Sequence, residues 1–411
     1  MLDAFSQHAP HPYFSADDGE LIIGGRKVSA VAAELGRTPF YAYDREIMRR
    51  KVTELRTVLP RQVEIHYAMK ANPMPEVVRH FAGLVDGIDV ASANEMDVAI
   101  AAGMRDELVS FAGPGKTPAE LERAVAAGIV INMESELEMR RIVEIATRMG
   151  KRPKVAVRVN PDFELKTSGM KMAGGPKQFG VDAERVPQML DELGDLPLQF
   201  WGFHIYSGSQ NLRPEIIADA QQKSAALAIE LARRAPEPVR MLNLGGGLGI
   251  PYFPGEQPLD LGPIGENLRT LVPKIQTALP QASIALELGR YLVGESGIYV
   301  CRVHDKKVSR GHVFLITDGG LHHHLAASGN FGQVIRKNYP VLVANRIGSE
   351  RRENASVVGP LCTPLDLLAD RMELAEAEVG DLIAVFQSGA YGLTASPRAF
   401  LSHPEPAEVA V

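Results

Sequence analysis

The chain has 411 residues, of which 45% are hydrophobic and 23% are charged, and this ordinary globular composition excludes a disordered or fibrous protein. Its 44 basic and 50 acidic side chains leave a net charge of −6, which argues against a protein that coats nucleic acid. Two cysteines are too few for a disulfide framework, no apolar run approaches the roughly 20 residues of a membrane helix, and residues 1–12 lack a secretory signal pattern. We therefore expect a cytoplasmic protein without membrane or nucleic-acid partners.

The pattern of an α/β fold begins near Pro39, after a polar segment over residues 1–37 that contains one strand-like patch, Glu20–Ile23. Short β-rich runs then alternate with segments of helical periodicity. The expected strands are Glu64–Met69, Gly87–Ala91, Leu108–Ala112, Ile129–Met133, Lys154–Asn160, Leu198–Ile205, Met241–Leu244 and Ser283–Leu286. Eight such units predict a closed (β/α)₈ TIM barrel over residues 38–290, with an open doubly wound sheet as the alternative.

A different pattern follows Arg290, where strand-like runs succeed one another without crossover helices between most of them. The runs are Gly297–Val303, Val313–Asp318, Val341–Asn345, Ser356–Val358 and Leu382–Phe386. They predict a C-terminal antiparallel β domain over residues 291–411. We expect the N-terminal segment, residues 1–37, to pack with this domain and to contribute a strand to it.

Functional side chains of such a barrel gather where its strands end. Lys70 closes the first run, and a lysine at the end of an apolar strand is partly desolvated, which lowers its pKa and makes the amine a nucleophile. His204 ends the sixth run and meets the loop Ser207–Ser209, whose hydroxyls and amides suit an anion. The structural alternatives are a surface lysine that covers apolar neighbours with its stem and a histidine satisfied in the core.

Two further strand ends add a glycine loop and a carboxylate. The seventh run leads into Gly245, Gly246 and Gly247, whose backbone amides can approach an oxyanion closely, and loops after strands seven and eight are the usual phosphate site of this barrel. The eighth run ends at Glu287, three residues before Arg290, and a simple ion pair between these two is the alternative. A reactive lysine, a phosphate cradle, a histidine and a carboxylate at one barrel mouth match the needs of pyridoxal 5′-phosphate.

Six short motifs carry a resemblance to a known family over residues 38–408. They are Tyr-Ala-Met-Lys-Ala-Asn at 67–72, Gly-Ser-Gln at 208–210 after a histidine, Gly-Gly-Gly-Leu-Gly at 245–249, Glu-Leu-Gly-Arg at 287–290, Gly-Pro-Leu-Cys at 359–362 and Gly-Ala-Tyr-Gly at 389–392. Together they resemble the fold-type III pyridoxal-phosphate decarboxylases of amino acids, the family of diaminopimelate and ornithine decarboxylases. The sequence around them most resembles a bacterial branch associated with exosortase and exopolysaccharide gene clusters.

The resemblance implies a role for each matching residue toward the cofactor. Lys70 would form the Schiff base, His204 would stack on the ring, and Glu287 would pair with the pyridine nitrogen, with Asp89 near the lysine and the ring. The phosphate would be held by Ser209, Gly245, Gly246, Gly247, the backbone at Gly289 and Arg290, and Tyr391.

The resemblance also implies substrate contacts and an assembly. Family members are homodimers with active sites at the interface, so Cys362 would reach into the partner's site and return a proton to Cα after CO₂ leaves. Arg336 would bind a substrate carboxylate, with Arg290 and Tyr339 beside it. Taken alone, a cysteine such as Cys362 is more often a small buried hydrophobic residue than a catalytic thiol. The Gly-Pro-Leu-Cys motif around it favours the catalytic interpretation.

Some positions depart from the family pattern. Thr363 follows the cysteine, where the two best-known members have an acidic residue that binds the distal amine of the substrate. The Thr363 hydroxyl carries no negative charge, so a free diamino acid bound through its distal amine is disfavoured as the substrate. Asp366, three residues further along, could supply the charge instead. Tyr339 is displaced by one residue, and Tyr206 stands where a second histidine is frequent.

Two segments remain outside the cofactor pattern. His322, His323 and His324 are adjacent, but consecutive residues point in different directions, so we predict no metal site there. The long, Gly-rich and basic segment 166–178 is expected to be a mobile loop over the barrel mouth or a dock for an acidic carrier.

Three functions therefore compete. The leading one is decarboxylation of an amino acid, either meso-diaminopimelate or an amino acid without a distal ammonium, free or tethered to an acyl-carrier protein. A racemase of the alanine racemase type shares the barrel and the lysine, but Gly-Pro-Leu-Cys argues against it. A non-catalytic pyridoxal-phosphate carrier resembles the bare barrel, and the roughly 120 residues after Arg290 argue against that class.

Overall fold

The computed structural model describes residues 7–163, 170–171 and 174–411. The chain divides into two compact units. The barrel unit contains Lys51–Gly249 and Leu259–Tyr291, and the β unit contains the described residues up to Arg50, Ile250–Pro258 and Leu292–Val411. Much of the loop predicted over residues 166–178 falls on residues 166–169 and 172–173, which lie outside the described residues.

Within the described part of the barrel unit, eight parallel strands close into a ring, which confirms the predicted (β/α)₈ barrel. In ring order they are β5 (Val63–Ala68), β6 (Gly87–Val90), β7 (Val109–Phe111), β8 (Val130–Met133), β9 (Lys154–Asn160), β12 (Gln199–His204), β14 (Met241–Gly246) and β15 (Ser283–Leu288). β15 then pairs with β5 again, so no open sheet edge remains in the ring.

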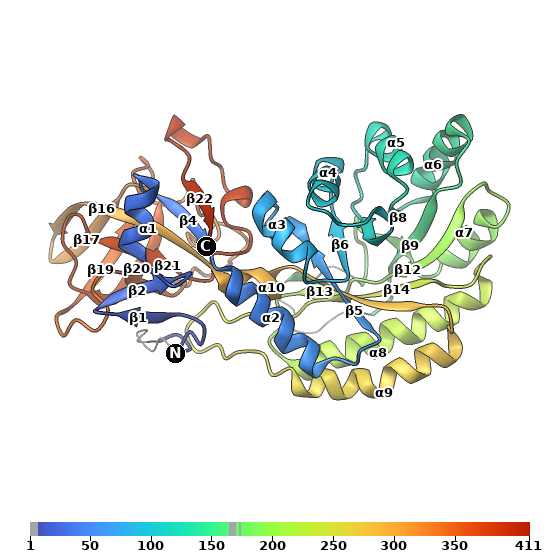
Figure 1. Ribbon diagram of the computed structural model, residues 1–411, viewed down its shortest axis with the longest axis horizontal. Coiled ribbons are helices and arrows are strands. Elements are labelled where there is room, and N and C mark those ends of the chain that lie inside the picture. Colours follow the sequence, from blue (N-terminus) through green and yellow to red (C-terminus); the bar gives the residue numbers. More distant parts are fainter. Residues whose placement is uncertain (1–6, 164–169, 172–173) are drawn as a thin grey trace. The chain divides into compact units, whose positions relative to one another are not determined.

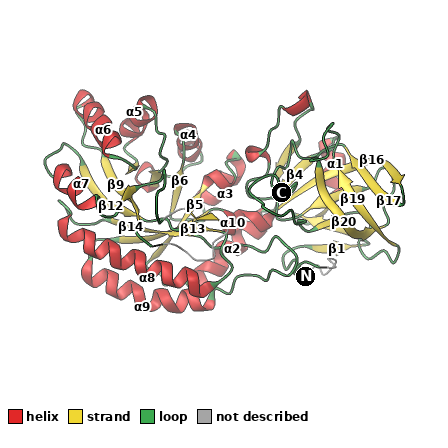
Figure 2. Cartoon of the chain, turned by 180° about the vertical axis from the view of Figure 1, so that it is seen from behind, coloured by secondary structure: helices red, strands yellow, loops and turns green. Residues whose placement is uncertain are grey.

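Helices cover the outside of this ring (Figure 1 and Figure 2). They are α3 (Pro75–Ala82), α4 (Ala93–Ala101), α5 (Pro118–Ala127), α6 (Glu136–Met149), α7 (Val186–Leu193), α8 (Pro214–Leu231) and α9 (Gly262–Ala278). Three shorter or shared elements complete the unit: β10 (Met170–Lys171), β11 (Val181–Asp182) and β13 (Gly208–Ser209). α2 (Arg45–Val58) and α10 (Arg290–Val293) contain residues of both units.

The local sequence explains where the helices begin and end. α5 starts with a capping box in which Thr117 accepts from the Glu120 N–H and Glu120 reaches back to the Thr117 N–H. It ends at Gly128, whose φ of 77° is a left-handed conformation that favours glycine. α6 also begins with a side-chain cap, in which Ser135 accepts from the Glu138 N–H, and it ends at Gly150, whose φ is 63°.

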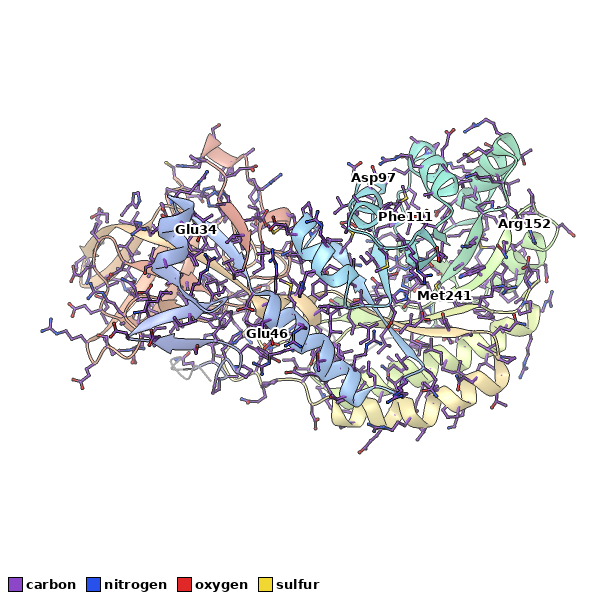
Figure 3. All side chains as sticks on the ribbon, viewed as in Figure 1. Glu34, Glu46, Asp97, Phe111, Arg152 and Met241 are labelled. Atoms are coloured by element: carbon purple, nitrogen blue, oxygen red, sulfur yellow. The ribbon has the colours of Figure 1, made fainter. Side chains whose placement is uncertain are left out.

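Strand β5 shows how the barrel separates its two faces. Tyr67 packs outward on Phe81 of α3, with ring centres 4.1 Å apart. The alternation of a β-strand then turns its neighbours Glu64, His66 and Ala68 toward the interior. Met241, labelled in Figure 3, begins β14 and belongs with Val130 and Ala156 to a small apolar cluster of the barrel strands. Lys70, His204 and Glu287 lie at the opposite ends of their strands, where the strands finish.

The β unit is built around a mixed sheet in the order β18-β21-β16-β17-β19-β20. Its strands are β16 (Gly297–Ser309), β17 (His312–Thr317), β18 (Val341–Val343), β19 (Arg352–Val358), β20 (Leu367–Ala375) and β21 (Leu382–Val385). Along this path the strands pair antiparallel, as predicted, except that β17 and β19 are parallel.

The N-terminal residues enter the β unit by two routes. β4 (Phe40–Tyr43), which follows the expected start of the barrel at residue 38, pairs instead with β16 and with β22 (Ala407–Ala410). All four β4 side chains are buried there. A small sheet of β1 (Ser15–Asp17), β2 (Glu20–Ile23) and β3 (Arg26–Lys27), together with α1 (Val28–Leu35), adds Leu21 and Ile23 to the same core.

The described helices include none whose length and apolar character would let it cross a bilayer.

Candidate active site

Lys70 lies directly beyond the end of β5, in the short 3₁₀ turn Met69–Ala71. Met69 and Ala71 on either side of it are buried, while the lysine side chain is 41% exposed. The turn is held by Tyr67, whose hydroxyl donates to the Asn72 carbonyl at 2.8 Å. This anchoring places the Lys70 Nζ 3.3 Å from Glu287 Oε1 on β15.

Glu287 connects the lysine to the predicted histidine. Its carboxylate is 5% exposed; Oε1 faces Lys70, and Oε2 lies 2.9 Å from His204 Nε2 on β12. Burial by itself raises the pKa of this carboxyl, but Lys70 and the hydrogen bond from His204 outweigh it and hold the pKa well below its usual range. Glu287 is therefore ionised at neutral pH, at the centre of a three-residue group that the sequence pattern predicts.

The aromatic ring beside the lysine belongs to Tyr206, two residues beyond His204. The Lys70 Nζ lies 5.5 Å from the centre of the Tyr206 ring, within the range of a cation–π contact. His204 itself is 2% exposed, and its Nε2 is occupied by Glu287. The stacking of His204 on the cofactor ring remains a prediction. Tyr206, which the sequence marks only as a departure from the family pattern, is an additional aromatic ring beside the lysine.

The glycine loop packs against the neighbouring strand ends so closely that side chains are excluded. A Cβ at Gly246 would lie 2.0 Å from the Glu287 carbonyl oxygen, and one at Gly247 would lie 2.7 Å from that of Gly208. Gly245 and Gly247 also have left-handed φ values of 71° and 81°. Glycine is therefore required here by both space and conformation.

Gly289 has the same constraint at the end of β15. A Cβ there would lie 2.9 Å from the Ala68 carbonyl oxygen and from the Ala71 side chain. The absence of a side chain thus lets the Glu287 strand approach the turn that carries Lys70. Arg290 follows at once as the first residue of α10.

Several buried polar atoms in the barrel lack a hydrogen-bond partner among the described residues. Those on or just beyond the barrel strands are Asp89 Oδ2, Asn132 Oδ1, His204 Nδ1, Ser209 Oγ and Asn243 Nδ2. An unpaired buried polar atom is costly, so an interior with five of them is suited to a polar ligand rather than to a sealed core. With the amine of Lys70, the ionised Glu287 and the glycine loop, these residues fit pyridoxal 5′-phosphate, which needs an amine, a phosphate cradle and a carboxylate.

The segment around Cys362 lies in the β unit and is held by Asp366. Cys362 is an exposed free thiol, and the Thr363 hydroxyl accepts from the Leu365 N–H at 3.3 Å. Asp366 is 3% exposed, and its two oxygens accept from the Leu321 and Leu361 N–H groups at 2.6 and 2.8 Å. The Asp366 carboxylate is therefore already engaged in hydrogen bonds that hold the backbone of this segment.

Arg336 is engaged within the β unit in the same way. Its Nε and Nη2 donate to the Ser328 and Leu367 carbonyls at 3.2 and 3.0 Å, and its Nη1 donates to the Asn338 side chain at 2.6 Å. The predicted substrate carboxylate would have to share these nitrogens. That role remains a prediction, as does that of Tyr339, which is 5% exposed with its ring 4.7 Å from that of Tyr252. Tyr391 has a left-handed φ of 53°, uncommon for a residue with a side chain.

The three consecutive histidines are buried and point to different partners. His323 contacts the Tyr299 hydroxyl at 3.0 Å and the Pro404 carbonyl at 2.9 Å, and His324 contacts the Ser388 hydroxyl at 2.8 Å. Burial lowers the pKa of His322 to about 4 and the pKa values of His323 and His324 to about 3. Across the residues that the structure describes, no cluster of three His, Cys, Asp or Glu side chains is arranged to hold a metal ion.

Comparisons with known proteins agree with this geometry. The pyridoxal binding domain of the pyridoxal-dependent decarboxylases matches residues 45–294. The L-glutamyl-[BtrI acyl-carrier protein] decarboxylase of Niallia circulans is 38% identical over 378 residues, which cover 90% of this chain and 88% of that protein. The diaminopimelate decarboxylase of Aquifex aeolicus is 32% identical over 404 residues, which cover 98% and 93%.

A solved structure extends the likeness to three dimensions. The crystal structure of diaminopimelate decarboxylase from M. jannaschii superposes with a TM-score of 0.88 at 25% identity, covering 97% of this chain and 93% of that one. The match includes both the barrel unit and the β unit. The chain belongs to the family of pyridoxal-dependent decarboxylases, and it is a pyridoxal 5′-phosphate-dependent amino-acid carboxy-lyase.

Proposed function

We propose that this enzyme decarboxylates an amino acid whose distal end carries no free ammonium, and that its substrate is tethered to an acyl-carrier protein. The observation that carries the proposal is the uncharged segment beside Cys362. Thr363 has no charge, and the carboxylate of Asp366 is bound to two backbone N–H groups. An amino acid whose distal carboxyl is joined to a carrier needs no anionic partner at that end, and a relative with 38% identity is named for such a substrate.

The barrel residues provide the binding and proton-holding functions. Pyridoxal 5′-phosphate supplies the electron sink for the pair released when the bond between Cα and the carboxylate breaks. Lys70 binds the cofactor through its amine, and the ionised Glu287 favours a proton on the cofactor's ring nitrogen. His204 would stack on the cofactor ring and orients Glu287, and Tyr206 offers its ring face beside Lys70.

The remaining residues of the proposed site hold the phosphate and handle the substrate. Ser209, Gly245–Gly247, the backbone at Gly289–Arg290, and Tyr391 would hold the phosphate. We infer a homodimer in which Cys362 of the partner subunit gives a proton to Cα once CO₂ has left. A thiol suits this step because it can give up a proton and take one back.

The substrate is tested by measuring CO₂ release from the holoenzyme. We expect turnover of an L-glutamyl pantetheine thioester and slower turnover of meso-diaminopimelate, by roughly 30-fold to several thousand-fold, because an unpaired ammonium typically costs about 2–5 kcal/mol. Thr363→Glu should reduce the difference in turnover rate between the two substrates. Thr363→Ser is the matched control that should leave this difference unchanged. Equal or faster turnover of meso-diaminopimelate by the unaltered enzyme would reject the proposed substrate class while leaving the decarboxylase intact.

Cys362 has a separate test based on the fate of the proton. Cys362→Ala should keep its cofactor and release CO₂, but a proton placed on the cofactor's carbon rather than on Cα leaves the amino group on the cofactor. Aldehyde and aminated cofactor should therefore build up, as detected by mass spectrometry. Cys301→Ala is the matched control, since Cys301 is fully buried and burial raises the pKa of its thiol. Amine as the sole product of the Cys362 variant would contradict the role.

A further inference from the structure

A buried histidine that the proposed mechanism does not use lies inside the barrel on β5. His66 is 5% exposed, and a Cβ on Gly87 of β6 would lie only 2.7 Å from its ring, so the missing side chain of Gly87 makes room for it. Its two ring nitrogens face carboxylates on opposite sides. Nδ1 lies 3.4 Å from Asp89 Oδ1, and Nε2 lies 3.4 Å from Glu64 Oε2.

These two partners determine the charge of the ring. A neutral imidazole has one N–H and one bare nitrogen, so one of the carboxylates would face a lone pair. A doubly protonated ring satisfies both. Burial by itself lowers the pKa of His66, but Asp89 and Glu64 outweigh it and raise the pKa to about 10. The ring is therefore an imidazolium at neutral pH.

The two carboxylate oxygens of Asp89, on β6, differ in their contacts: Oδ1 has hydrogen-bond partners and Oδ2 has none within the described residues. Its Oδ1 accepts from the Ser110 hydroxyl at 2.5 Å and faces His66, and Ser110 is itself fixed by Asn132 Nδ2 at 3.2 Å. Its Oδ2 is buried and has no partner within the described residues. Asp89 pairs in register with Ala68, two residues before Lys70, so the bare oxygen belongs to the strand next to the lysine.

Within the described residues, the cationic side chain that faces Asp89 is His66. Glu287 on the opposite neighbouring strand, β15, is in register with His66, but its carboxylate is already held by Lys70 and His204. Ser110, which also binds Asp89, is uncharged. The two ionisable groups that face the His66 ring are thus Glu64 and Asp89, and only Asp89 lies at the group of unpaired atoms that fits the cofactor.

We propose that His66 is a positioning residue for the cofactor: it holds Asp89 through Oδ1, together with Ser110, so that Oδ2 is directed at a proton donor on the bound cofactor or on Lys70. The proposal rests on the cofactor site of the proposed function and not on its substrate. A purely structural histidine would pack in the same place, but its loss would affect the cofactor no more than the loss of any other buried side chain.

The first test measures the charge of His66 in the unaltered apoprotein. With ring-¹³C-labelled histidine, the His66 signal is assigned by its loss in His66→Gln, and its chemical shift is followed between pH 6 and 9. We expect the shift of an imidazolium throughout, and a shift toward the neutral form in Asp89→Asn. A signal that titrates near the ordinary value of about 6.5, or that stays neutral, would overturn the proposal.

The second test is a double-mutant cycle on cofactor affinity, read from the absorption of bound pyridoxal 5′-phosphate. His66→Gln and Asp89→Asn should each weaken binding by about 10- to 100-fold. The double variant should be no weaker than Asp89→Asn alone, because His66 acts through Asp89. The pH at which the cofactor band changes should move in the same direction in both single variants.

Glu64→Gln is the matched control, since it removes the other carboxylate partner of His66 but leaves the Asp89 contact. It should change cofactor affinity by less than about threefold. Additive effects in the cycle, or unchanged affinity in His66→Gln, would show that His66 does not act through Asp89. Because neither readout requires turnover, a failure of the proposed substrate would leave this test unaffected.

Discussion

Lys70→Arg is expected to lower the rate of CO₂ release by roughly 10³- to 10⁶-fold, the loss typical of removing a covalent catalytic group. Arginine keeps a positive charge near Glu287 Oε1, which lies 3.3 Å from the lysine nitrogen. It cannot act as an amine nucleophile, because the guanidinium remains protonated. The variant therefore separates the nucleophile from the ion pair, whereas alanine would remove both.

The position of covalent attachment is checked at the same time by borohydride reduction and peptide mass analysis. In the unaltered holoenzyme we expect the reduced cofactor on the peptide that contains Lys70, and in Lys70→Arg we expect none. Lys223→Arg is a suitable control, because Lys223 is an exposed lysine on α8 paired with Asp219. A label on another lysine of the unaltered protein would reject the site described here.

Glu287→Gln is expected to reduce kcat by about 10²-fold to several thousand-fold, since removing one member of a buried charge pair costs about 3–5 kcal/mol. Glutamine occupies nearly the same volume, but it brings no negative charge to Lys70, to His204 or to the cofactor's ring nitrogen. Glu287→Asp keeps the charge and should lose less. A Gln variant within threefold of the original enzyme would contradict the central place of this carboxylate.

The pKa of Glu287 adds a pH signature to this prediction. Lys70 and His204 lower it despite burial, so the carboxylate stays ionised from neutral pH down through mildly acidic conditions. The kcat of the unaltered enzyme should therefore not fall between pH 8 and 5 because Glu287 gains a proton. The stability that its charge contributes is present above the ordinary value of about 4.3 and is lost as pH falls below it toward the lowered pKa.

The barrel was predictable because its information is local. The strands are short runs rich in apolar residues, helices α4, α5 and α6 begin with side-chain caps, and parallel strands joined by helices close in few ways. The group formed by Lys70, His204 and Glu287 was predictable for the same reason, since residues at the ends of parallel strands meet at one mouth. The motifs that carry these three residues lie far apart in sequence, but each follows or ends a strand of a repeated βα unit.

Other features depended on pairing between distant segments. β20 was absent from the predicted strands because its sequence, Leu-Leu-Ala-Asp-Arg-Met-Glu-Leu-Ala, mixes charged and apolar residues, and its pairing with β19 determines which of them are buried. β4 falls within residues 38–290, which were assigned to the barrel without a strand there, yet it pairs with β16 and β22, some 250 and 360 residues away. Periodicity shows that a segment is a strand, but it does not identify its partners.

Single side chains of the site show the same contrast between local information in the sequence and contacts between distant segments. By itself the sequence determined the fold class, the cofactor and the amine, carboxylate and glycine loop that suit it, because the chemistry of each of these depends on residue type. Only the tertiary structure decided which groups are already occupied. Asp366 and Arg336 use their charges within the β unit, Tyr206 lies beside the lysine, and His66 meets Asp89 inside the barrel. Whether a polar group is available to a ligand depends on contacts made across the fold, and those contacts exist only once distant strands are brought together.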